Sequence, residues 1–163
     1  MVVERQNVAQ ADVLVVGGGL AGVLAALESA RTGARTVLVM KGSAGSGART
    51  TTAVAGGGFA AAFGHANPED SPAIHFRDTL EGDEFLNDQR LVRLMAEEAP
   101  GRLRYLEAMG VEFEREGDRY LQRQAPGHTY PRSVMLPGTR MGQLMRTLAA
   151  RAQESGVAVR RGL

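Results

Sequence analysis

The feature that most constrains the fold is a glycine-rich turn between a predicted strand and a predicted helix. Gly17, Gly19 and Gly22 form the pattern G-x-G-x-x-G directly after the predicted strand 12–16, which is apolar from Val13 onward. The first glycine permits a tight turn, the second lets a pyrophosphate approach the backbone, and the third lets the helix pack closely on the strand. The N-terminus of the following helix then faces the phosphates of a dinucleotide. The alternative that this pattern leaves open is a glycine-rich turn of another α/β domain.

The segments around the turn complete a strand–helix–strand unit over residues 12–40. Residues 12–16 and 36–40 are short runs dominated by valine and leucine, typical of buried parallel strands. Between them, apolar residues recur on one helix face at Leu20, Val23, Leu24 and Leu27. Gly33 stands where a glycine commonly ends a helix. The sequence therefore predicts an α/β fold, a Rossmann-like domain with a parallel sheet and right-handed crossover helices.

The end of the second strand argues against a nicotinamide dinucleotide. An acidic residue usually hydrogen-bonds the ribose of NAD at this position, whereas the chain has Met40 followed by Lys41. A thioether is a poor hydrogen-bond acceptor, and no arginine stands there to bind the 2′-phosphate of NADP. An NAD-dependent dehydrogenase is therefore the disfavoured interpretation of the turn.

At this point the chain resembles a known family of flavoproteins. Residues 13–22, 37–41 and 52–58 are similar to the FAD-binding start of fumarate reductase and succinate dehydrogenase flavoprotein subunits and of L-aspartate oxidase. Members follow the second strand with Ser-Lys and a loop of the form T-x-x-A-Q-G-G. That loop is matched by Thr52, Ala55, Gly57 and Gly58, with Gly56 in place of the glutamine. Weaker similarity continues through residues 75–79, Gly82, 88–89, 120–123, 127–128 and Arg132.

The resemblance implies an FAD-dependent oxidoreductase in which the flavin exchanges hydride with a small dicarboxylate-like acid. The turn and the resemblance together assign the FAD site to Gly17, Gly18, Gly19, Leu20, Ala21, Gly22, Lys41, Thr51, Thr52, Ala55, Gly57 and Gly58. Covalently flavinylated members carry a histidine where this chain has Thr51, so non-covalent FAD is expected. The family's proton-donating arginine and substrate-binding histidines lie in a later cap region. No catalytic residue is therefore named in this chain.

We expect residues 1–163 to be an N-terminal FAD-binding domain that is incomplete in this chain. A flavin loop at 41–58 follows the first unit, then a helical and hairpin insertion at 59–138, then a helix and strand at 139–163. The last strand is expected to return to the sheet beside residues 36–40. Three parallel strands are fewer than the five or six of a doubly wound domain. The implied partner is therefore the remainder of the flavoprotein or a separate subunit.

Capping signals predict two helices in the first half of the insertion. Ser71 precedes a proline and predicts the start of one helix. Asn87 or Asp88 predicts the cap of a second helix, which Pro100 is expected to interrupt and Gly110 to end.

Weaker signals describe the rest of the chain. Residues 59–63 are predicted to form a short helical turn, residues around 117–118 the turn of a hairpin, and residues 125–138 an irregular segment. Thr139 is expected to cap the last helix. Its predicted apolar face consists of Met141, Leu144, Met145, Leu148 and Ala152.

Composition removes several classes of function. The absence of cysteine excludes disulfides, thiolate catalysis and iron–sulfur ligation by this chain. With five phenylalanines, three tyrosines and no tryptophan, a stacking platform for nucleic acid is not expected.

Residues 67–118 carry an excess of eight negative charges and residues 119–163 an excess of seven positive ones. The simplest interpretation is that the basic segment docks against the acidic one, or against parts of a longer protein, rather than against the phosphates of nucleic acid or a dinucleotide. No apolar run is long enough to cross a membrane and no targeting signal is recognisable, so a cytoplasmic location is expected.

The three histidines, His65, His75 and His128, show no metal-ligand spacing. His75 and Asp78 lie three residues apart and could form a local pair on one helix face, although a structural role for both is the favoured interpretation. His128 with Arg132 could contact an anionic substrate, or could only order the proline-rich loop, and the sequence leaves both open.

Two rival functions stay open beside the dicarboxylate oxidoreductase. One is a non-catalytic dinucleotide-binding or assembly module that needs a partner chain. The other is an amino-acid oxidase similar to L-aspartate oxidase.

Overall fold

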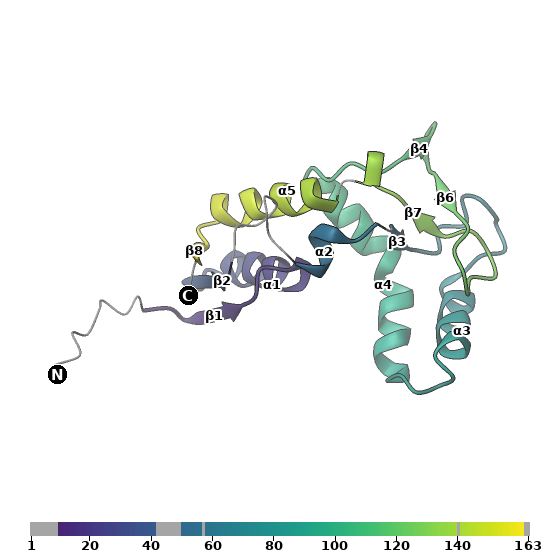
Figure 1. Cartoon of the computed structure of the whole chain (residues 1–163), viewed down its shortest axis with the longest axis horizontal. Helices are drawn as coiled ribbons and strands as arrows, with labels where there is room; N and C mark the ends of the chain where they lie inside the picture. Colours follow the sequence, from purple (N-terminus) through teal and green to yellow (C-terminus); the bar gives the residue numbers. More distant parts are fainter. Residues whose placement is uncertain (1–9, 42–49, 57, 140, 162–163) are drawn as a thin grey trace. The chain divides into compact units, whose positions relative to one another are not determined.

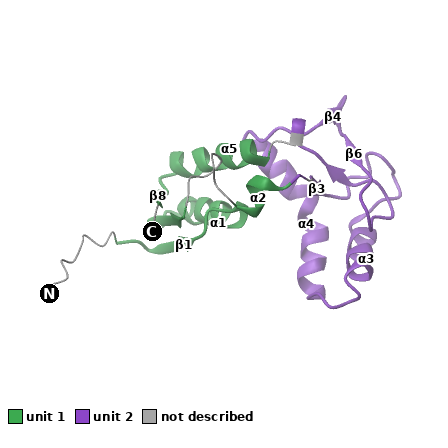
Figure 2. Cartoon of the chain, in the orientation of Figure 1, with its two compact units in different colours: residues 1–55, 141–163 green, residues 56–140 purple. Residues whose placement is uncertain are grey.

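The computed structural model describes residues 10–41, 50–56, 58–139 and 141–161 of the chain. The chain divides into two compact units. Unit 1 comprises residues 1–55 and 141–163, and unit 2 comprises residues 56–140 (Figure 2).

Unit 1 is built on a three-stranded parallel sheet. Its strands are β1 (Val13–Val16), β2 (Thr36–Met40) and β8 (Ala158–Arg161), in the order β1-β2-β8 (Figure 1). Val13 lies opposite Thr36, and Leu38 lies opposite Val159. The predicted α/β class with a parallel sheet is confirmed, and so is the position of the last strand beside residues 36–40.

Two helices supply most of the apolar core of unit 1. α1 (Leu20–Arg31) and α5 (Met141–Glu154) pack against each other, and α1 also contacts β1 and β2. α1 buries Val23, Ala26 and Leu27, whereas Leu20 and Leu24 are half-buried. α5 buries all five residues of its predicted apolar face. Gly33 follows α1 with a φ of +86°, the left-handed conformation that the predicted helix end requires.

Unit 2 contains a helical hairpin of α3 (Pro72–Gly82) and α4 (Gln89–Ala108). The Ser71 hydroxyl accepts a hydrogen bond from the Ile74 N–H at 3.3 Å, as predicted for a cap. Of the two candidates for the second cap, Asp88 is the one that caps α4, since its side chain accepts from the first N–H groups of that helix.

The predicted interruption at Pro100 is wrong, because α4 runs through this residue. A proline inside a helix cannot donate to the carbonyl four residues earlier, which costs about 3 kcal/mol. Ala96 and Leu103, seven residues apart on one helix face, are 0% and 3% exposed. Packing of this face on both sides of Pro100 outweighs the missing hydrogen bond.

The remaining strands of unit 2 are short and antiparallel. β3 (Phe59–Ala60) and β6 (Gln122–Arg123) both pair with β7 (Ser133–Val134), while β4 (Arg115–Glu116) and β5 (Arg119–Tyr120) form the predicted hairpin. The helical turn predicted at 59–63 is wrong, because Phe59 pairs with a strand far along the chain. That strand also shows that the segment 125–138 is not wholly irregular. A short helix, α2 (Thr51–Val54), and a 3-10 turn, η1 (Pro137–Thr139), complete the described elements.

Among the residues that the structure describes, no helix is both long enough and apolar enough to cross a bilayer.

Candidate functional site

The fold of unit 1 is by itself sufficient to explain two of the glycines around the junction of β1 and α1. Gly17 has a φ of +116°, which side-chain-bearing residues rarely adopt, and its N–H donates to the Val39 carbonyl at 2.8 Å. A Cβ on Gly22 would collide with the Gly17 carbonyl oxygen, so no side chain fits between α1 and the end of β1. The predicted roles in turning and in close packing therefore match the geometry of these two positions.

Gly19 has a different explanation from its neighbours. Its backbone angles (φ −78°, ψ 179°) are open to any residue, and a Cβ there would meet Thr52 Oγ1 at 4.0 Å, an ordinary contact. The fold thus does not require a glycine at position 19. Close approach of a phosphate to the backbone does require one.

The N-terminus of α1 is capped from another segment of the chain. The N-cap residue Gly19 has no side chain to accept a hydrogen bond, and the Leu20 N–H instead donates to Thr52 Oγ1 at 3.4 Å. Thr52 belongs to α2, whose own N-cap is Thr50, with its hydroxyl accepting from the Ala53 N–H at 3.2 Å. Two stretches that are 32 residues apart therefore meet at the helix end where a negative charge is stabilised.

This arrangement fits the pyrophosphate of a dinucleotide. The helix N-terminus offers backbone N–H groups and the positive end of the helix dipole. The Thr52 hydroxyl accepts from Leu20 and keeps its own hydrogen for an acceptor beside Gly19. Thr50 was missed from the sequence, although a threonine that precedes a short helix is a recognised capping signal.

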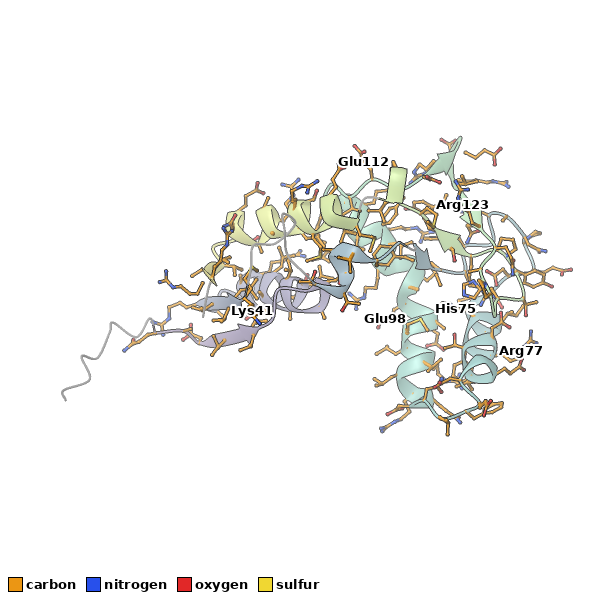
Figure 3. All side chains as sticks on the ribbon, in the orientation of Figure 1. Lys41, His75, Arg77, Glu98, Glu112 and Arg123 are labelled. Atoms are coloured by element: carbon orange, nitrogen blue, oxygen red, sulfur yellow. The ribbon has the colours of Figure 1, made fainter. Side chains whose placement is uncertain are left out.

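The other predicted site residues lie as follows. In unit 1, Gly18 is buried, Leu20 and Ala55 are half-buried, and Ala21, Lys41 and Thr51 are exposed. Lys41 directly follows the end of β2 (Figure 3). Gly57 lies outside the described residues. Gly58 belongs to unit 2, where a Cβ would collide with the Val134 carbonyl oxygen, so the pairing of β3 with β7 already accounts for this glycine.

Met40 packs beneath the turn rather than beside a ribose. Its side chain is 4% exposed, and its Cε would lie 2.8 Å from a Cβ on Gly18. The contact explains why both Gly18 and an apolar residue at the end of β2 suit this fold. It is also consistent with the inference that the chain lacks a standard NAD site.

Arg132 and its carboxylate partners form a buried cluster in unit 2. Arg132 is 0% exposed, and its Nη2 donates to Asp70 Oδ1 at 2.9 Å and to Asp78 Oδ2 at 2.8 Å. Asp78 also accepts from the N–H and the hydroxyl of Thr129, both at 2.7 Å. Burial raises the pKa of Asp78, but the hydrogen bonds from Thr129 and the charge of Arg132 together hold it below its ordinary value. Of the two alternatives for Arg132, ordering of the loop is the one that this geometry supports.

His75 and Asp78 are both buried, in line with the favoured structural role, and the Asp78 carboxylate is engaged by Thr129 and Arg132 rather than by His75. The His75 ring lies edge-on to that of His128, with centroids 6.2 Å apart. Within the described part of the chain, no group of three or more His, Cys, Asp or Glu residues could hold a metal ion.

Comparison with known proteins identifies the cofactor class. Residues 12–162 match the family described as FAD binding domain. The chain is 45% identical over 140 residues to a fumarate reductase (CoM/CoB) of Methanothermobacter marburgensis, covering 85% of this chain and 25% of that protein. It is 42% identical over 120 residues to L-aspartate oxidase of Streptomyces coelicolor, covering 72% of this chain and 20% of that protein.

A solved structure of Escherichia coli quinol fumarate reductase superposes with a TM-score of 0.82 at 28% identity, over 94% of this chain and 26% of that one. The chain thus spans about a quarter of the length of these relatives, and the match includes both glycine-rich segments. The resemblance inferred from the motifs is confirmed. The chain belongs to the FAD binding domain family, as the FAD-binding part shared by fumarate reductase, succinate dehydrogenase and L-aspartate oxidase flavoproteins, and its cofactor is FAD.

Proposed function

We propose that this chain is the FAD-binding part of a longer oxidoreductase that transfers hydride between the flavin and a small dicarboxylate-like acid. The observation that carries the proposal is the meeting of Gly19, the N-terminus of α1 and Thr52 in unit 1. It brings the glycine-rich turn together with the second loop of the family's motif. The bound flavin supplies the redox chemistry.

The residues of this chain then act by binding and orientation. Gly17 and Gly22 shape the turn, and Gly19 leaves its backbone open to the pyrophosphate. The end of α1 stabilises the phosphate charge, and the Thr52 hydroxyl both caps that helix and donates to the phosphate. Ala21, Lys41, Thr51 and Ala55 are proposed to line the same site.

The substrate is proposed from the relatives, since the FAD-binding part itself carries no assigned catalytic residue. Fumarate reductase and L-aspartate oxidase, as named, act on C4 acids, which supports a small carboxylate. The remainder of the flavoprotein, or a partner subunit, would complete the site. A cytoplasmic location stays a prediction.

Substitution of Gly19 tests the cofactor assignment. Gly19→Val introduces a side chain that the backbone and the surrounding protein atoms accept but that occupies the approach of the pyrophosphate. We expect FAD content to fall by at least about tenfold with little change in the unfolding midpoint. The matched control is Gly101→Val, at a glycine of α4 where a Cβ meets no atom within 4 Å. Retention of flavin at the unsubstituted level by Gly19→Val would refute the assignment.

The mode of attachment has its own test. Because Thr51 cannot form the histidyl linkage of covalent members, we propose that FAD is held non-covalently. Acid precipitation of the flavin-loaded protein is expected to leave the flavin in the supernatant. Yellow colour that stays with the denatured pellet would contradict this.

L-aspartate oxidase-like activity is the second candidate, supported by the 42% identity to the Streptomyces coelicolor enzyme. Flavin reduction by succinate and by L-aspartate, followed by absorbance in the protein expressed from the complete gene, distinguishes the two candidates. Reduction by neither substrate, and no reoxidation of the reduced flavin by fumarate, would favour the non-catalytic binding module.

A further inference from the structure

The end of the α3–α4 hairpin in unit 2 exposes a group of large apolar side chains. Phe85 and Leu86 lie in the connection between the helices, with 60% and 84% of their surface exposed. Leu91, Leu94 and Met95 in the first turns of α4 are 64%, 51% and 42% exposed. These five residues are called the hairpin patch. Exposed apolar groups of this kind mark interaction surfaces more often than scattered single residues do.

The sequence of α4 limits the exposed apolar surface to the first turns of this helix. In its first two turns α4 is apolar on two sides, because Val92 and Ala96 are buried while the patch residues point outward. After Met95 the outward side becomes charged, with Glu98 paired to Arg102 at 2.6 Å. A helix that is apolar on both sides is normally covered on both sides.

The backbone between the helices holds the patch in a strained conformation. Glu84 and Phe85 have φ values of +49° and +63°, the left-handed region that costs a residue with a side chain about 1–2 kcal/mol. The turn is fixed by the Phe85 N–H donating to the Leu80 carbonyl and by the Leu86 N–H donating to the Asp83 carbonyl, both at 2.9 Å. Strain that is retained in this way commonly marks a functional surface.

The arginines beside the patch are paired within the hairpin. Arg90 lies 3.3 Å from Asp88, and Arg93 lies 3.9 Å from Glu97 while its guanidinium stacks over the Phe76 ring. A partner surface therefore needs no acidic groups to neutralise these arginines. It needs apolar side chains that fit against Leu86, Leu91 and Leu94.

The length of the relatives indicates which partner covers the patch. A contact within one polypeptide does not bear the free-energy cost of association, so a small apolar patch suffices. The curated fumarate reductase relative is about four times longer than its match to this chain, since 140 residues are 25% of it.

We propose that the hairpin patch is the docking surface for an apolar segment of the same polypeptide outside residues 1–163. The proposal rests on the proposed function, in which this chain is part of a longer flavoprotein. The alternative occupants are a second copy of the chain and a separate protein.

Cysteine labelling tests the proposal, because the 163 residues contain no cysteine of their own. Leu86→Cys and Leu94→Cys are made in the protein expressed from the complete gene. The matched control is Glu116→Cys, at an exposed position of β4 in the same unit. Maleimide labelling is followed by peptide mass spectrometry, so cysteines elsewhere in a longer protein do not interfere. The flavin content of each sample is measured separately.

We expect the two patch cysteines to react at least about tenfold more slowly than Glu116→Cys in the complete protein, with no change on dilution. Equal rates at the patch and control positions overturn the proposal. Protection that disappears on dilution, or that needs a second protein, also overturns it, because the occupant is then a separate molecule. Protection in a protein without FAD supports the docking surface and refutes the proposed function.

Discussion

Both units of the chain have an apolar core, but unit 2 also buries a cluster of charged side chains. The largest fully buried side chains of unit 1 are aliphatic or thioether groups: Val23, Leu38, Leu144, Met145 and Leu148. In unit 2 the largest is Arg132, held between Asp70 and Asp78. Unit 1 carries its Asp12–Arg35 ion pair on the surface, with 46% and 64% of the side chains exposed.

The difference shows how the two units are specified. An apolar core depends on burial of many similar side chains, none of which needs a particular partner. A buried ion cluster depends on specific partners, because a buried charge without one is strongly destabilising. Unit 2 should therefore be much more sensitive than unit 1 to the loss of a single charged group.

The largest expected effect comes from breaking the buried cluster. Arg132→Met leaves Asp70 and Asp78 in the interior without their cation, which we expect to lower the free energy of unfolding of unit 2 by about 3–5 kcal/mol. Urea denaturation measures the loss, and hydrogen exchange resolved by peptide assigns it to α3 and the loop that it holds.

The matched control for this substitution is Arg123→Met. Arg123 pairs with Glu114 at 2.6 Å, but the arginine is 56% exposed. An exposed pair contributes at most about 1 kcal/mol. If the two substitutions have the same effect, burial is not what makes the Arg132 cluster important.

The same contrast explains what the sequence could predict about the fold. Every element of the β1–α1–β2 unit follows from signals within a few residues, such as the aliphatic runs and Gly33. The strand at Phe59 and the burial of Arg132 depend on partners more than 50 residues away in the sequence, with no local pattern. Pro100 is a local signal that tertiary packing overrides.

The candidate site also has one part that local sequence predicts and another that depends on contacts between distant segments. The glycine pattern and its strand–helix context predicted a turn followed by a helix, and Gly17 lies in that turn, Gly19 is the N-cap of α1 and Gly22 lies in its first turn. The contact between Thr52 and the N-terminus of α1 joins distant segments, and only family resemblance pointed to it. Gly58 was assigned to the flavin loop for its residue type, whereas its neighbours in unit 2 supply a packing reason.

An intermediate effect is expected from pH, again confined to unit 2. Burial, with the charge of Arg132 and the nearby His128 ring, lowers the pKa of His75 from 6.5 to about 4, while Asp78 opposes this shift. In the unfolded chain His75 binds a proton below pH 6.5, but in the folded protein it stays neutral until about pH 4. Its contribution to stability is therefore complete above pH 6.5 and is lost between pH 6.5 and 4, by about 3 kcal/mol.

The test compares unfolding free energies at several pH values for the unsubstituted protein and for His75→Gln. The substitution should flatten the dependence between pH 6.5 and 4, even if it lowers stability throughout. Asp70, whose pKa burial raises, remains in both proteins and works in the opposite direction. An unchanged slope in His75→Gln would show that another group, such as His128, carries the effect.

The smallest expected effect comes from the surface ion pair of unit 1. Arg35 Nη2 lies 2.7 Å from Asp12 Oδ1, and the Arg35 N–H donates to Asp12 Oδ2 at 2.8 Å. The side-chain hydrogen bond from Arg35 is the main reason that the pKa of Asp12 is about 2 instead of 3.8. Arg35→Met removes that bond but keeps the backbone one, so the Asp12 pKa should rise only part of the way, as measured by carboxyl NMR. Because the pair is exposed to solvent and screened by salt, we expect no resolvable change in the unfolding midpoint at neutral pH.

A clear loss of protection against hydrogen exchange in β1 would mean that this strand depends on a particular charge. The two units would then rest on the same kind of interaction, contrary to the contrast between their buried side chains.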